Sequence, residues 1–229
     1  MIPISPQRVV DVTEAGVRKR LKGVFMMKNY LLAITAGVGL VAASSFLFNI
    51  NTRAFAAQPQ QSAAVFDPDG RLQLPTGFRK WVFVGAPLTP NALNNGKANF
   101  PEYHHVYIEQ KNVDAYLKTG EFPEGTVIVK ELTRVLNPDF PDGSRKEPSG
   151  RGYFNGAYNG VDVTVKDSKR FANTNRWGFF SFGHHPEPYD KSAAEAPAIR
   201  CASCHQAYVA QTDMTWIQFY PLLRDKKGY

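Results

Sequence analysis

The chain has 229 residues, of which 43% are hydrophobic and 21% charged, a globular composition that excludes disordered and fibrous proteins. Its formal charge is +7, but residues 1–56 carry seven basic and two acidic side chains, which leaves 20 basic and 18 acidic residues in the remainder. Because that remainder is close to neutral, we expect no nucleic-acid partner.

The N-terminal region has the features of an export signal. An apolar stretch from Tyr30 to Ile50 follows the basic Lys28 and precedes the small-residue pattern Ala54-Phe55-Ala56, where signal peptidase would cleave. At 21 residues the stretch is also long enough for a membrane anchor, which is the alternative. Export places the protein in the periplasm. The predicted division is a signal peptide or anchor over 1–56, a polar linker over 57–65 and one domain over 66–229.

The body of the chain is rich in short β-branched and aromatic runs that end at glycine or proline, as strands of an antiparallel sheet do. Asn112 to Thr119 predicts a short helix with Asn112 as its cap and Gly120 as its end. Residues 137–150 predict a loop, and residues 214–224 a helix that stops or kinks at Pro221. We predict an α+β fold, mainly antiparallel sheet with short helices. The expected strands are 81–85, 104–109, 126–135, 152–157, 160–166 and 177–182.

Two cysteines, Cys201 and Cys204, are followed directly by His205. C-x-x-C-H is the attachment signature of a c-type haem, because two thiols on one helical turn can each add to a vinyl group while the histidine faces the iron. Three alternatives are a zinc half-site, a redox pair and a simple disulfide. A zinc half-site would need a second pair of ligands, and a redox pair normally follows a strand in a βαβ unit. We predict a covalently bound haem c on a helix near the C-terminus.

The second axial position of that iron is an open question. Met214 is the single methionine after residue 56, and it lies only nine residues past His205, too near to reach the opposite face of a haem. Core packing is its expected role. The histidine pairs 104–105 and 184–185 are the alternative ligands. We expect a five-coordinate iron with an open site, which binds small ligands or acts on them.

Five further segments of the body are distinctive: WVFVGAPLTPNALNNGKANF (81–100), TGEFPEGTVIVKEL (119–132), GYFNGAYNG (152–160), VKDSKRFANTNRWGFFSF (165–182) and TDMTWIQFYPLLR (212–224). Together with the C-x-x-C-H motif, they make the sequence similar to the cytochrome P460 family over most of its body. The resemblance implies an exported, dimeric haem protein with a β-sheet fold that oxidises hydroxylamine to nitrogen oxides and passes electrons to a periplasmic c-type acceptor.

The family also has a covalent bond from a lysine nitrogen to a porphyrin meso carbon, and Lys130 matches that lysine. From alternation alone, Lys130 lies opposite Val127 and Val129 and would be a solvated residue on an exposed strand face. The resemblance implies instead that this face covers the haem edge. A related branch, the cytochromes c′-beta, lacks the cross-link and binds nitric oxide or carbon monoxide without turnover, which is the alternative function.

Hydroxylamine oxidation needs a proton acceptor near the iron, and a glutamate before the haem motif is implied by the resemblance. Glu195 is the candidate base, because burial can raise a carboxyl pKa toward the working pH. An offset of one residue would put Ala196 at that place instead. Glu195 would then be an exposed residue of an alanine-rich loop.

Overall fold

The computed structural model describes residues 62–229, so the predicted signal and most of the predicted linker lie outside the described residues. Within 62–229, no helix is both long and apolar enough to cross a membrane. Residues 62–65 lie on the domain: the Ser62 hydroxyl donates a hydrogen bond to the Gly125 carbonyl, and Ala63 and Ala64 pack against buried side chains.

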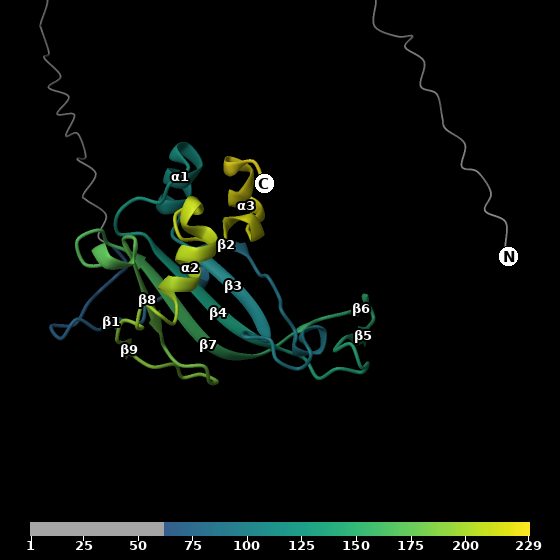
Figure 1. The fold of residues 1–229 in the computed structure, drawn as a ribbon. Helices are drawn as coiled ribbons and strands as arrows, with labels where there is room; N and C mark the ends of the chain where they lie inside the picture. Colours follow the sequence, from purple (N-terminus) through teal and green to yellow (C-terminus); the bar gives the residue numbers. More distant parts are fainter. Residues whose placement is uncertain (1–61) are drawn as a thin grey trace, which may run out of the picture. The chain divides into compact units, whose positions relative to one another are not determined.

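The centre of the domain is an antiparallel sheet of five strands in the order β2-β3-β4-β7-β8 (Figure 1). Its strands are β2 (Val82–Gly85), β3 (Glu102–Ile108), β4 (Val127–Val135), β7 (Asn155–Lys166) and β8 (Trp177–Ser181). Two small sheets flank it. They pair β1 (Leu72–Gln73) with β9 (Ser192–Ala193), and β5 (Arg145–Glu147) with β6 (Gly150–Gly152).

Three short α-helices gather on one side of the sheet (Figure 1). They are α1 (Gln110–Thr119), α2 (Ala202–Val209) and α3 (Pro221–Arg224). Single turns of 3-10 helix complete the described elements: 78–80, 91–94, 172–174, 210–212, 217–219 and 225–227. The expected α+β fold, with a helix near the C-terminus, is therefore confirmed.

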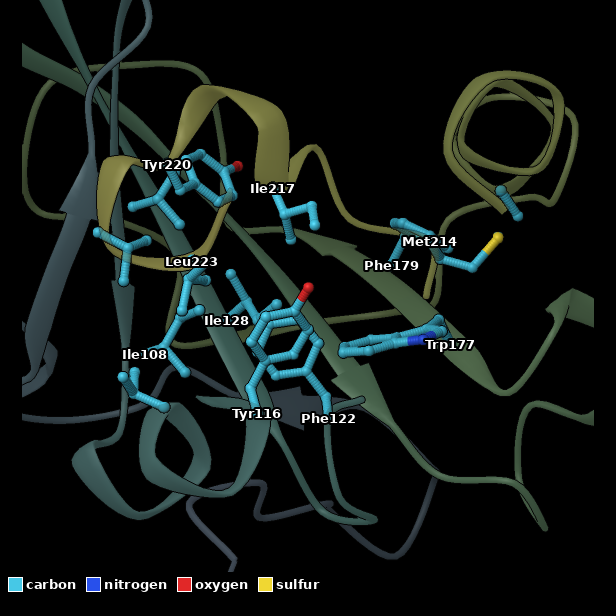
Figure 2. Close-up of a cluster of buried hydrophobic side chains, with 14 residues drawn as sticks. Ile108, Tyr116, Phe122, Ile128, Trp177, Phe179, Met214, Ile217, Tyr220 and Leu223 are labelled. Carbon is cyan, nitrogen blue, oxygen red and sulfur yellow. The ribbon is translucent and has the colours of Figure 1, made fainter. Parts of the chain in front are cut away.

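Both faces of the sheet are covered by side chains. We call the face under the helices the helix-side face. Its core contains Val106, and Figure 2 shows Ile108, Ile128 and Phe179 of the same core. We call the other face the opposite face. Its core includes Val129, Val163 and Phe180, and the N-terminal segment, residues 62–66, packs against it. Successive residues of a strand point to alternate faces, so strand register decides which side chains meet the helices.

Several boundaries differ from the sequence prediction. The predicted strands 152–157 and 160–166 are largely one strand, β7, because the register irregularities opposite Leu132 and Thr133 are absorbed without breaking the pairing. Part of the predicted loop 137–150 instead forms the small hairpin of β5 and β6.

Two predicted helix boundaries are wrong. Helix α1 begins at Gln110 after Glu109, and the Asn112 side-chain amide lies inside the first turn, where it donates to the Glu109 carboxylate. The predicted end at Gly120 is confirmed. Pro221 starts helix α3 rather than ending a helix, because proline suits the first helical position, where no backbone N–H is needed.

Candidate functional site

Helix α2 carries the C-x-x-C-H motif on the helix side of the sheet. The buried Ala202 and Val209 fix this helix to the core, since their side chains are almost fully enclosed. Cys201 stands at the start of the helix and is half-buried, whereas Cys204 is exposed one turn later, and both thiols are free. The packing of α2 thus leaves both sulfurs available for a bond to another group.

The imidazole of His205 is held in a defined orientation. Its Nδ1 lies 2.6 Å from the Met214 carbonyl oxygen, which can only accept, so Nδ1 carries the proton. The ring packs against Phe179, with 4.6 Å between ring centroids. Burial lowers the pKa of His205, and the ring is neutral at pH 7. Its Nε2 therefore bears a free lone pair, the state in which histidine binds a metal.

Lys130 lies on the same side as α2. It pairs with Val106 on β3 and Asp162 on β7, and Val106 belongs to the same core as Ala202 of α2. Its Nζ is 2.9 Å from an Asp162 carboxylate oxygen and 4.1 Å from the centroid of the Phe100 ring. The side chain is only 27% exposed. Lys130 is thus a paired amine on the helix-side face and not a solvated surface residue.

Sequence reasoning missed the carboxylate beside this lysine. Asp162 lies between Lys130 and His184, whose Nε2 is 3.1 Å from the second carboxylate oxygen. Burial by itself would raise the pKa of Asp162, but Lys130 and His184 together hold it well below its usual range. The alternation of GVDVTVK is a signal that Asp162 lies on the face of β7 opposite to Val161 and Val163, and the register between β4 and β7 then places it beside Lys130.

The two histidine pairs are divided between different surroundings. His104 lies on the helix-side face, where burial, with a contribution from Lys130, lowers its pKa to about 4. Its neighbour His105 is on the opposite face and contacts the Thr133 hydroxyl and the Asn155 side chain. The hydrogen bond to Asp162 raises the pKa of His184. Of the four candidate ligands, His104 and His184 lie in the surroundings of Lys130.

Glu195 is not brought together with Lys130 and His205. Its side chain is exposed, and its backbone forms a β-bridge with Phe180, whose ring belongs to the core of the opposite face. The next residue, Ala196, packs against the helix-side core and donates its N–H to the Phe179 carbonyl. Partial burial raises the pKa of the Glu195 carboxyl. The residue that faces α2 from this segment is therefore Ala196.

These residues fit the chemistry of a haem site. Two free thiols three positions apart, a neutral imidazole with its Nε2 unprotonated and a primary amine all lie on one side of the sheet. Among residues 62–229 there is no cluster of three or more His, Cys, Asp or Glu side chains that could hold a metal ion by itself.

Comparison with known proteins identifies a family. The family model for cytochrome P460 matches residues 75–217, a span that runs from before β2 through α2 and Met214. No curated protein matches the chain.

Proposed function

Because the chain belongs to the cytochrome P460 family, whose members are haem proteins, we propose that it is a periplasmic c-type haem enzyme that oxidises hydroxylamine to nitrogen oxides. The observation that carries the proposal is the position of Lys130, whose amine lies on the sheet face that the C-x-x-C-H helix covers. A non-catalytic haem site needs no such amine. Export, a homodimer and a c-type electron acceptor belong to the same proposal.

Four residues would hold the cofactor in this proposal: Cys201 at the N-cap of α2, Cys204 and His205 within α2, and Lys130 on β4. Cys201 and Cys204 would form the thioether bonds, the Nε2 of His205 would bind the iron, and the Lys130 nitrogen would bond to the porphyrin. When bound, the haem would supply a redox-active iron for the oxidation of hydroxylamine. The protein must keep His205 neutral, and its burial does so.

Hydroxylamine oxidation releases protons and electrons in equal number, so a group near the substrate must take up protons. We assign this role to Asp162, because it is the carboxylate next to Lys130 on the helix-side face, whereas Glu195 is exposed. A bond from the Lys130 nitrogen to the porphyrin would remove its full ammonium charge. The pKa of Asp162 would then be less depressed, and the carboxylate would be a better base.

His184 gives those protons a way out. It contacts the other oxygen of Asp162 and is 42% exposed, so it joins the carboxylate to solvent. An imidazole can both receive and release a proton.

Mass and turnover test the proposal. After acid–acetone extraction, the intact mass of the purified protein should still include one haem. The protein should also consume hydroxylamine in the presence of an oxidant. The ferrous Soret band should lie far to the red of ordinary haem c. An extracted polypeptide without haem, or an ordinary Soret band together with no turnover, would refute it.

A second function is favoured by one observation, the alanine at 196. If the residue facing the helix side from this segment must be a base for turnover, Ala196 leaves the site without it, and the protein would bind nitric oxide or carbon monoxide as a cytochrome c′-beta does. The two functions differ in one measurement. A binder holds nitric oxide on the ferrous haem but leaves hydroxylamine unchanged.

A further inference from the structure

A pair of residues directly after the 210–212 turn has an unusual backbone. Asp213 and Met214 have φ angles of 56° and 59°, so two successive residues are in the left-handed region. Aspartate visits this region at modest cost, but methionine has no side-chain group that compensates for it. Such a conformation persists only where surrounding contacts impose it.

The contacts that impose it meet at the Asp213 carboxylate. One oxygen accepts hydrogen bonds from Lys166 Nζ at 2.6 Å and from the Phe122 backbone N–H at 3.1 Å. The other accepts from Trp177 Nε1 at 3.1 Å and has Arg176 at 3.6 Å. The Lys166 and Asp213 side chains are only 2% and 6% exposed. One carboxylate thus ties this turn to β7, to the N-terminal end of β8 and to the segment before β4.

Lys166 is held in turn by a second bond. Its Nζ donates to the Phe122 carbonyl at 2.7 Å, so the same residue whose N–H binds Asp213 also binds the lysine. A buried ion pair is weak evidence for stability, because the cost of desolvating two charges offsets their attraction. What this arrangement does fix is position: the backbone of residues 213 and 214 cannot rotate without breaking these bonds.

The fixed backbone of residues 213 and 214 contacts the imidazole of His205 in the C-x-x-C-H motif. The Met214 carbonyl oxygen accepts a hydrogen bond from His205 Nδ1 at 2.6 Å, while the Met214 side chain is buried in the helix-side core (Figure 2). The left-handed conformation at 213 and 214 is therefore what presents this carbonyl to His205.

We propose that Asp213 and Lys166 are positioning residues for the iron ligand: their buried ion pair fixes the Met214 carbonyl, which sets the orientation and donor strength of His205. The inference rests on the proposed function only in taking His205 as the ligand. A hydrogen bond from the far ring nitrogen makes a ligating imidazole a stronger donor, which favours ferric iron and lowers the reduction potential.

The test uses the haem-loaded protein and the variant Asp213→Asn. Asparagine also adopts the left-handed region and can still accept from Trp177, while the charge that holds Lys166 is lost. The iron–histidine stretching band of the ferrous protein should move to lower frequency, and the reduction potential should rise. The haem should remain covalently attached.

Glu131→Gln is the matched control. Glu131 is also a fully buried carboxylate in an ion pair, with Arg79, but it lies on the opposite face. This variant should lower the melting temperature without moving the iron–histidine band or the potential. A general loss of stability therefore predicts equal behaviour of the two variants, and positioning predicts a difference.

Trp177→Phe is a second test of the positioning role, because it removes one hydrogen-bond donor to Asp213 and keeps the charges of Asp213 and Lys166. It should shift the band and the potential in the same direction as Asp213→Asn, but less, and it decides the question if Asp213→Asn does not fold. Unchanged bands and potentials in the folded variants, with a normal parent protein, would overturn the positioning role and leave the proposed function standing. A parent protein without covalent haem or an iron–histidine band would overturn both.

Discussion

At the scale of single residues, the contact between Lys130 and Asp162 is the most informative in the site. The ammonium of Lys130 holds the carboxylate of Asp162 in its ionised form, although Asp162 is mostly removed from solvent. In the proposed function, a bond from the lysine nitrogen to the cofactor would remove that effect.

Asp162→Asn should slow hydroxylamine oxidation by about 10²- to 10⁴-fold, the usual cost of losing a general base, while haem attachment is kept. Stopped-flow spectroscopy with hydroxylamine and an oxidant measures it. Glu195→Ala is the control and should turn over close to the parent rate, since the Glu195 side chain is exposed. The reverse order of the two rates would assign the base to Glu195.

Lys130→Ala should act on the spectrum as well as on the rate. Without the lysine nitrogen, the ferrous Soret band should return to the position of an ordinary haem c, because the porphyrin is no longer substituted. Lys111→Ala changes a lysine outside the sheet and should leave the band in place. An unchanged red-shifted band in Lys130→Ala would show that the cross-link is made elsewhere or not at all.

His104 should make the protein sensitive to acid. Its pKa is lowered to about 4 in the folded chain, against about 6.5 in an unfolded one, so the unfolded chain binds the proton first. Stability should fall as the pH drops from about 6.5 to about 4, by at most about 3 kcal/mol. Urea unfolding at pH 7 and pH 4.5 should show a smaller loss for His104→Gln than for the parent. His105→Gln, on the opposite face, should keep the parental loss.

At the scale of elements, the close approach of Phe171 to β8 leaves no room for a side chain at Gly178. A Cβ built there would lie 2.3 Å from the Phe171 ring, which is itself buried against the sheet. Gly178→Ala should therefore cost about 1–3 kcal/mol in the free energy of unfolding, measured with urea. At Gly152, where the nearest atom is 3.8 Å from such a Cβ, the same change should have little effect. Equal losses at both glycines would contradict this explanation.

The alternation of residues along single strands made many of the strands predictable. The contacts between strands could not be predicted, because they depend on the pairing register. The runs at 81–85 and 126–135 are strands as expected, and the opposite orientation of Lys130 from Val127 and Val129 follows from period two alone. The neighbour of Lys130 could not be foreseen, because Asp162 is 32 residues away and the register across β4 and β7 decides the contact.

The same limit explains Glu195 and Pro221. A shift of one residue decides whether Glu195 or Ala196 faces α2, and the isolated bridge to Phe180 that fixes it leaves no periodic pattern. Pro221 is compatible with a helix end or a helix start, and only the extended conformation of Tyr220 before it distinguishes the two.

At the scale of the whole domain, the N-terminal segment completes the core of the opposite face. Phe66 bridges to Leu72 and packs against Phe171 and Phe180, and the Ser62 hydroxyl binds the Gly125 carbonyl. A protein that starts at residue 67 should therefore be less stable than one that starts at residue 57, by about 2 kcal/mol or more. Thermal melting of the two proteins measures it. Indistinguishable melting temperatures would mean that the segment is dispensable for the core.

The adjacent residues Lys130 and Glu131 make the function and stability of the domain sensitive to the register of β4. Each has its own ion-pair partner, Asp162 on the helix side and Arg79 on the opposite side, so a slip of one residue would exchange two unlike charges between the faces. Insertions and deletions should therefore be purged from β4 over evolutionary time and accumulate in residues 136–154, where the chain leaves the sheet before β7. Among related sequences, the length of the small hairpin of β5 and β6 should vary, while the length and register of β4 stay constant.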